Sequence, residues 1–346
     1  MITVPVDKLT EIGIEIFTKQ GASLERATFL VETLVEANLT GHDSHGVYYY
    51  VRYSDRIKDG YIKVDAEPEI IKETPGTAYI DGHWTFGQMT AKKLVEVAVD
   101  KAKENMVAAV GAFNCNHIGR IGYYTNWAAK QGIISTFYVN VGHPIVSVHN
   151  GLGKTFGTNP YSASVPTGGD IPFLVDYATS VVAAGKLSVA KAKGVKIPKH
   201  WTRDQYGRVN DDPDILSKGG WLLPFGEYKG YGLQMVSELL GAALTGSRLG
   251  PQGVSVPPSP NGIFMMAVNP EAFVGLDEFV KTTDGLLEQV KNWPALGGER
   301  VMVPGEPEKE TKEKRMREGI ELPETTWTEI NELCEKIGVD IDAILK

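Results

Sequence analysis

Between residues 88 and 141 the chain alternates twice between a helical pattern and an apolar run. The stretch 88–105 has the length of a long helix, and 107–113 (VAAVGAF) is an apolar run of strand length. A helix over 120–131 and a strand over 133–141 repeat the order. Helix, strand, helix and strand in one continuous run predict an α/β core.

The segments on either side of this core are mostly helical in pattern. Helices are expected early in the chain over 6–21, 23–41 (with Ser23 as its cap) and 47–59, before short strands at 69–73 and 77–82. Later we expect an apolar helix over 231–246, a Pro/Gly loop over 248–262, a strand over 263–269, and short helices around 324–336 and 340–345. The tract EPEKETKEKRMRE (306–318) is typical of a solvated helix face.

The overall charge and the cysteine content narrow the class of protein. A net charge of −8 disfavours a general role on nucleic acid or on an anionic membrane, where phosphates must be neutralised. The longest apolar stretch, 133–148, is interrupted by polar residues and by Pro144, so no membrane span is expected. With two cysteines and no signal peptide at its start, the chain is expected in the cytoplasm.

The stretch GHDSHG (41–46) is the densest group of chemically active side chains. His42 and His45 are three residues apart and would suit a metal if His117, His143 or His149 supplied a further ligand. The same residues would suit acid–base chemistry. Asp43 or Ser44 could instead cap the helix expected near Val47. These alternatives stay open at this point.

Other polar groups beside glycines indicate a ligand pocket. Arg120 lies between Gly119 and Gly122 and could hold an anion, and Asp176 follows the apolar PFLV, where it could orient a histidine. Helix-cap hydroxyls that suit phosphate are expected at Thr179 and Ser180, and Lys229 precedes the helix at 231–246. A pocket with phosphate-binding ends and acid–base residues favours an enzyme.

The stretch GLGKTFG (151–157) nearly matches a Rossmann dinucleotide fingerprint, with Asp176 about twenty residues further on. The segment TNPYSASVP follows it where the fingerprint requires an amphipathic helix. We therefore interpret GLGKTFG as a turn and reject a Rossmann fold.

Six stretches follow one another along the chain: GHDSHGV (41–47), NHIGRIGYYTNWAAKQGIIS (116–135), FGTNPYSASVP (156–166), DYATSVVAAGK (176–186), YKGYGLQMVSELLGAALTG (228–246) and VPGE (303–306). In this order they resemble the malate/L-lactate dehydrogenase family of NAD(P)-dependent oxidoreductases, and HIGRIGY is the form found in its hydroxycarboxylate dehydrogenase B branch. The resemblance implies an α/β fold that is specific to the family and not Rossmann, with a mixed, largely antiparallel sheet flanked by helices. It also implies a helical cap built from both termini (1–75 with 307–346), an α/β domain (76–306) that binds cofactor and substrate, and a homodimer with the cofactor near the interface.

The resemblance also assigns roles to single residues. Ser44, His45 and Asp176 match a proton relay, and His117 matches a second histidine that is an acid/base in some members and a cofactor contact in others. The residues matched to contacts with NAD or NADP are His45, Gly119, Arg120, Ile121, Asp176, Tyr177, Ala178, Thr179, Ser180, Lys229, Val303, Pro304, Gly305 and Glu306.

One position departs from the family pattern. Many members carry an arginine for the substrate carboxylate three residues after the Ser-His-Gly glycine, where this chain has Tyr49. Arg52 and Arg120 are the other candidates for this role. The neighbouring tyrosines 48–50 would suit a larger or aromatic 2-oxo acid, or they are ordinary packing residues.

We therefore expect an NAD(P)-dependent 2-hydroxycarboxylate dehydrogenase, or 2-oxo acid reductase. Hydride transfer to the carbonyl carbon builds negative charge on the carbonyl oxygen, and His45, with a pKa near neutral, would donate the proton. The alternative is a metal-dependent hydrolase or lyase that uses His42 and His45.

Overall fold

The computed structural model describes residues 1–192, 194–252 and 260–346. Within them, the main sheet has seven strands in the order β2-β3-β4-β11-β5-β6-β7, and only β3 and β4 pair in parallel. The strands are β2 (Glu69–Thr74), β3 (Thr77–Asp81), β4 (Val107–Cys115), β5 (Ile134–Val141), β6 (Tyr161–Val165), β7 (Phe173–Tyr177) and β11 (Asn261–Val268). This arrangement confirms the mixed, largely antiparallel sheet, and β4, β5 and β11 confirm three strands predicted from apolar runs.

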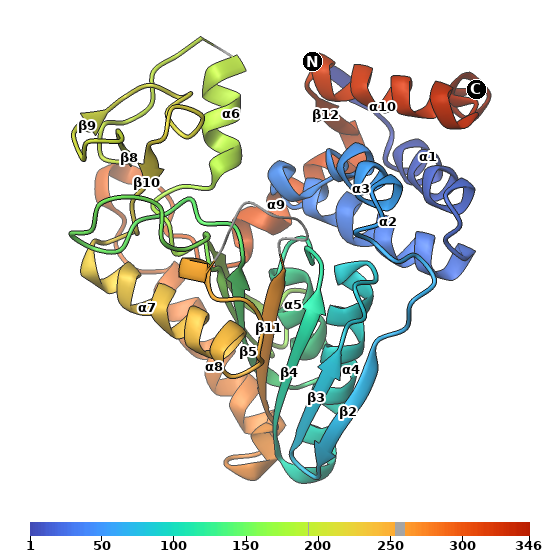
Figure 1. Ribbon diagram of the computed structural model, residues 1–346. Coiled ribbons are helices and arrows are strands. Elements are labelled where there is room, and N and C mark those ends of the chain that lie inside the picture. The colour runs from blue at the N-terminus through green and yellow to red at the C-terminus, as the bar shows by residue number, and fades with distance from the viewer. Residues whose placement is uncertain (193, 253–259) are drawn as a thin grey trace.

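Two helices cover one face of this sheet: α4 (Gly87–Asn105) and α5 (Gly122–Lys130) (Figure 1). The cross-strand row Val110, Met265 and Phe137 is fully buried in the cluster that also contains the apolar side of α4. The alternation predicted for 88–141 is confirmed, because α4, β4, α5 and β5 follow in that order.

The opposite face is covered only in part. Helix α7 (Tyr228–Glu238) continues into a π-helical turn at Leu239–Ala243, where Gly241 lies against the backbone of Asn140 and Gly262. A small sheet of β10 (Trp221–Leu222), β8 (Thr202–Arg203) and β9 (Val209–Asn210) lies beyond, with α6 (Ala184–Ala192) nearby. Residues 151–157 form a loop that leads to β6, so the rejection of a Rossmann turn is confirmed.

The two ends of the chain fold together. Strand β1 (Ile2–Val4) pairs with β12 (Ile320–Leu322), and helices from both ends share one apolar cluster. These helices are α1 (Val6–Lys19), α2 (Leu24–Leu39), α3 (Tyr49–Lys58), α10 (Glu324–Ile337) and α11 (Ile341–Leu345). Ser23 caps α2, as predicted, because its hydroxyl accepts a hydrogen bond from the Arg26 N–H. The expected helical cap from both termini is confirmed, and the pairing of β1 with β12 was not predicted.

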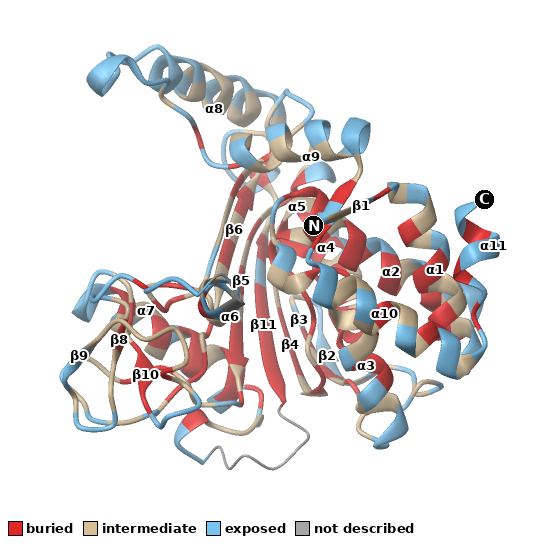
Figure 2. Ribbon diagram, turned by 90° about the horizontal axis from the view of Figure 1, so that it is seen from above, coloured by how far each residue is buried: buried red, intermediate tan, exposed pale blue. Residues whose placement is uncertain are grey.

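Two further helices join the sheet to this cap: α8 (Leu276–Lys291) and α9 (Glu306–Glu318). Helix α8 projects away from the sheet and buries none of its residues (Figure 2). The sequence pattern did not reveal α8 or α6. Part of the loop predicted over 248–262 falls on 253–259, which lie outside the described residues.

Candidate active site

The stretch 41–46 forms one short 3₁₀ turn, Asp43–His45, between α2 and α3. Asn38 in the last turn of α2 organises it: its side-chain oxygen accepts from the Val47 N–H (2.8 Å), and its amide donates to Asp43 (2.7 Å). A side chain on Gly46 would collide with Asn38, which explains the glycine. Capping by Asp43 or Ser44 near Val47 is wrong, since Asn38 takes that place and α3 has no side-chain cap.

Helix α9 holds the same turn from outside. His42 Nε2 lies 3.5 Å from Glu308 Oε1, and Arg315 donates to both carboxylate oxygens of Asp43. Gly41 lies against Thr311. Glu308, Thr311 and Arg315 share one side of the helix by their spacing. The expected solvated helix 306–318 is therefore wrong for this side, although α9 buries no residue.

Ser44 and His45 form the one direct contact of the expected relay. The Ser44 hydroxyl lies 2.9 Å from His45 Nδ1, so the other ring nitrogen, Nε2, is left for a ligand. Burial lowers the pKa of His45 to about 4, although the charge of Asp176 works in the opposite direction. The expected near-neutral pKa is wrong, because desolvation outweighs the carboxylate and keeps the ring neutral at pH 7.

His117 lies next to His45, with ring centres 5.6 Å apart and planes inclined by 23°. Its Nδ1 is 2.7 Å from the hydroxyl of Tyr53, which also accepts a hydrogen bond from Gln88. Tyr49 stacks on His117 at 4.4 Å. Burial, with smaller effects of His45 and Arg56, lowers the pKa of His117 well below its usual value. The structure thus brings together two neutral histidines that the sequence placed 72 positions apart.

Asp176 reaches the site from β7 but is held by other partners. Its Oδ2 accepts from Arg120 Nε (3.1 Å) and from the Gly122 N–H (2.9 Å). A Cβ on Gly122 would approach that oxygen to 2.6 Å, so the glycine permits the contact. No hydrogen bond joins Asp176 to His45 among the described residues, and the two interact through charge.

The three candidates for the substrate carboxylate differ in their surroundings. Arg120 is buried and also donates to Glu36 and Thr40. Arg52 is exposed and lies over the ring of Tyr48 at 4.8 Å. Tyr49 stays uncharged, since burial raises its pKa to about 12. The sequence reasoning missed Tyr53, although it repeats the position of Tyr49 at helical spacing.

Strand β7 connects the segments expected to bind cofactor. At its start, the Leu174 N–H donates to Pro304, and Gly305, with φ +99°, packs against Pro172. At its end, Asp176 holds 120–122, and the Phe225 N–H, in the loop before Lys229, donates to the Thr179 carbonyl. The stretches 119–121, 176–180 and 303–306 and the loop before Lys229 therefore lie along one strand.

The expected helix-cap role of Thr179 and Ser180 is wrong. Thr179 donates its hydroxyl to the carbonyls of Thr158 and Asn159, and Ser180 donates to Val182. Helix α6 begins only at Ala184. A side chain on Gly185 would meet Ser44 at 2.7 Å, so the first turn of α6 faces the turn at 41–46 instead.

These surroundings fit a dinucleotide better than a metal. Arg120 Nη2 is buried beside β7 without a hydrogen-bond partner among the described residues, so it can donate to a ligand. Gly119, with φ +74°, adopts a backbone conformation that favours glycine. The described residues contain no group of three or more His, Cys, Asp or Glu that could hold a metal. They also include no helix with the length and hydropathy needed to cross a bilayer.

Comparison with known proteins identifies the family of this chain. The family model for malate/L-lactate dehydrogenase matches residues 4–331. Hydroxycarboxylate dehydrogenase B of Escherichia coli O157:H7 is 34% identical over 94% of this chain and 91% of its own. L-sulfolactate dehydrogenase of Methanocaldococcus jannaschii is 35% identical over 95% of both chains.

The solved structures agree on the fold. Sulfolactate dehydrogenase of M. jannaschii superposes with a TM-score of 0.92 at 33% identity and covers 100% of both chains. Malate dehydrogenase of Pyrococcus horikoshii OT3 gives 0.90 at 33% identity, over 98% of this chain and 96% of its own. A hydrolase or lyase has no support from these relatives. The chain belongs to the malate/L-lactate dehydrogenase family and is an NAD(P)-dependent oxidoreductase of 2-hydroxy acids.

Proposed function

We propose that His45 exchanges a proton with the oxygen on C2 of a 2-hydroxy or 2-oxo acid. The contact between the Ser44 hydroxyl and His45 Nδ1 carries this proposal, because it fixes the ring and leaves Nε2 for the substrate. In the oxidation direction the neutral ring accepts the hydroxyl proton at Nε2, and in reduction it returns that proton to the carbonyl oxygen. The negative charge of Asp176 favours the charged ring that exists between these two events.

In this proposal His117 positions the same oxygen. If the Tyr53 hydroxyl donates to Nδ1, the proton of neutral His117 resides on Nε2, which can then donate to the substrate. Gln88 supports this direction of the Tyr53–His117 hydrogen bond. Its amide donates to the Tyr53 oxygen, which leaves the Tyr53 hydroxyl proton for His117 Nδ1. Tyr53 is a positioning residue in this scheme.

The segments along β7 would hold NAD or NADP, which supplies or accepts the hydride when bound. In this proposal 119–121 and 176–180 lie against the cofactor from two sides, with Lys229 and 303–306 at the ends of β7. Arg120 is paired with two carboxylates, but its free Nη2 can donate a hydrogen bond there.

An absorbance assay at the nicotinamide band tests this function with pyruvate, oxaloacetate, phenylpyruvate, hydroxyphenylpyruvate and a cyclic imine acid, each with NADH and NADPH. Replacing His45 by alanine should lower turnover by about 10²- to 10⁴-fold with cofactor affinity unchanged, because general acid–base catalysis is lost. His42→Ala should keep most of the turnover, since His42 contacts Glu308 and not the ring pair. Equal activity of His45→Ala and wild type would contradict the assignment.

We also propose a homodimer with the cofactor site near its interface. The sheet face opposite α4 and α5 carries an aromatic row across four strands: Phe264, Tyr138, Tyr161 and Tyr177. Tyr177 is 41% exposed, and it directly follows Asp176 in the expected cofactor segment.

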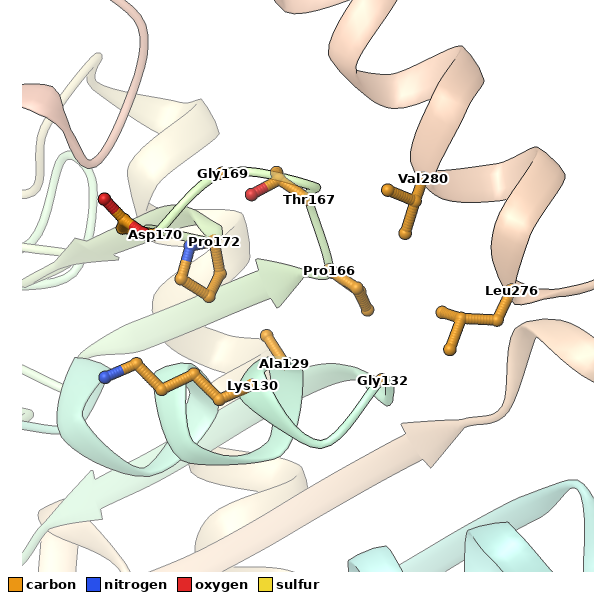
Figure 3. A pocket seen from close by; sticks show the side chains of 10 residues that line it. All are labelled: Ala129, Lys130, Gly132, Pro166, Thr167, Gly169, Asp170, Pro172, Leu276 and Val280. Atoms are coloured by element: carbon orange, nitrogen blue, oxygen red, sulfur yellow. The ribbon is translucent and has the colours of Figure 1, made fainter.

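Helix α8 supports the same proposal. Its exposed apolar residues include Leu286 and Val290, and Trp293 just beyond it is 71% exposed. At its base, Leu276 and Val280 face Pro166 and Gly132 across a pocket of about 270 Å³ (Figure 3). In a two-fold dimer, α8 of each copy would cover apolar surface of the other. Sedimentation equilibrium measures whether the protein is a dimer at micromolar concentration, and a monomer would contradict this arrangement.

Two smaller expectations belong to the same proposal. We place the protein in the cytoplasm, because Cys115 and Cys334 are both buried free thiols. We also treat 1–75 with 307–346 as one domain and 76–306 as the other. The separate apolar clusters of the cap and of the sheet support this division.

A further inference from the structure

One side of helix α3 faces the histidine pair. Tyr49 stacks on His117, and the Tyr53 hydroxyl lies 2.7 Å from His117 Nδ1. Arg56 follows at the next position of the same helical stripe, seven residues after Tyr49 and three after Tyr53. Helical side chains lean towards the N-terminus, so this position directs a long side chain back along the stripe, and the charge of Arg56 acts on both Tyr49 and Tyr53.

Arg56 is a charged side chain without a partner. It is half-buried, and among the described residues its guanidinium makes no hydrogen bond or ion pair. The positive charge of Arg56 contributes to the lowered pKa values of His117 and His143. Burial is the largest cause of both shifts, and Arg56 is the smallest of the causes. An unpaired guanidinium on the side of α3 that carries Tyr49 and Tyr53 is a binding group for an anion.

The other two arginines near the site are less suited to a carboxylate. Arg52 is exposed, with its guanidinium over the ring of Tyr48 at 4.8 Å. Arg120 already donates to the carboxylates of Asp176 and Glu36, so an incoming carboxylate would meet a surplus of negative charge.

We propose that Arg56 holds the substrate carboxylate, in the role for which this chain lacks an arginine at position 49. This assignment rests on the dehydrogenase function proposed above. The planar guanidinium pairs with both carboxylate oxygens and presents C2 of the substrate to the two histidines. Tyr49, which stacks on His117, then forms an uncharged wall beside the substrate.

The test compares Arg56→Gln with Arg52→Gln, a matched change on the neighbouring exposed side of α3. The assays use the best 2-oxo acid of the panel and its methyl ester, at saturating cofactor. Arg56→Gln should raise KM for the acid roughly 10- to 100-fold, the effect of losing a charged hydrogen-bonded pair. It should also abolish the preference for acid over ester and leave NAD(P)H affinity unchanged. Arg56→Lys should recover part of the loss, since it restores the charge without the planar fork.

Two results would overturn the assignment while the wild type is active: Arg56→Gln keeps the wild-type KM and acid preference, or Arg52→Gln loses as much as Arg56→Gln. Isothermal titration of the cofactor complex with oxamate, an unreactive analogue of a 2-oxo acid, gives a readout without turnover. Oxamate should bind wild type and Arg52→Gln alike and bind Arg56→Gln more weakly. If the wild type reduces no 2-oxo acid at all, the dehydrogenase function itself fails, and the role of Arg56 fails with it.

Discussion

Helices α8 and α9 are neighbours in sequence and opposite in character. Helix α8 has an apolar side, yet it buries none of its residues in this chain. Helix α9 is almost entirely charged, yet Glu308 and Arg315 reach the turn that carries His45. The difference shows that an amphipathic pattern alone does not decide whether a helix packs against its own chain. The charged side chains of α9 contact the turn at 41–46 of the same chain. In the proposed dimer, the apolar side of α8 packs against the second copy.

The largest expected effect concerns α8. Replacing Leu286 and Trp293 together by glutamate should weaken the proposed dimer at least about 100-fold, because two exposed apolar side chains would become charges inside an interface. Analytical ultracentrifugation over a dilution series measures the dissociation constant. Lys281→Glu, on the opposite side of the helix by its spacing, should leave it unchanged. A monomeric wild type would contradict the proposed dimer. A Lys281→Glu variant as disruptive as the double variant would contradict the placement of the apolar side of α8 in its interface.

A smaller effect is expected from the contacts of α9. Arg315→Ala removes the ion pair with Asp43 and should lower turnover about 10-fold, because a loosened turn misplaces His45. Lys314→Ala, which loses only an exposed pair with Glu318, should keep full turnover. Steady-state kinetics at saturating substrate compare the two variants. Equal turnover in both would show that α9 covers the turn without positioning it.

Acid should destabilise the region held by α9. The pKa of His45 is about 4 in the folded protein, against an ordinary value of 6.5. Between these values the unfolded chain binds more protons, so stability rises with pH and is lost as pH falls from 6.5 towards 4. Urea unfolding at pH 7 and pH 4.5 should differ by roughly 2 kcal/mol from this residue. His45→Gln should show a smaller difference, and His200→Gln, at an exposed site, should behave as wild type.

The sequence predicted those parts of the fold that depend on local pattern. The alternation over 88–141 gave α4, β4, α5 and β5, and the motif 41–46 led to a real contact between Ser44 and His45. Contacts between residues far apart in the sequence could not be predicted from local pattern. The docking of Arg315 on Asp43 joins residues 272 positions apart, and no local pattern marks it.

The site residue that was missed also depends on contacts between distant parts of the sequence. Tyr53 belongs to the site because α3 turns one side towards His117, and that direction depends on packing. The proposed role of Arg56 depends on the same side of α3. The pKa of His45 could not be predicted either, because it depends on how deeply folding buries the ring. A search at helical spacing from Tyr49 would have flagged both Tyr53 and Arg56 as candidates.

The pairing of β1 with β12 has a consequence for how this protein is made. Residues 2–4 leave the ribosome long before their partners 320–322 are synthesised. The same delay applies to Arg315, so the turn that carries His45 is without its support from α9 until residue 315 has been made. The sheet, whose strands end with β11 at residue 268, can form before that point. The turn that carries His45 therefore gains its support from α9 only after the strands of the sheet have been synthesised.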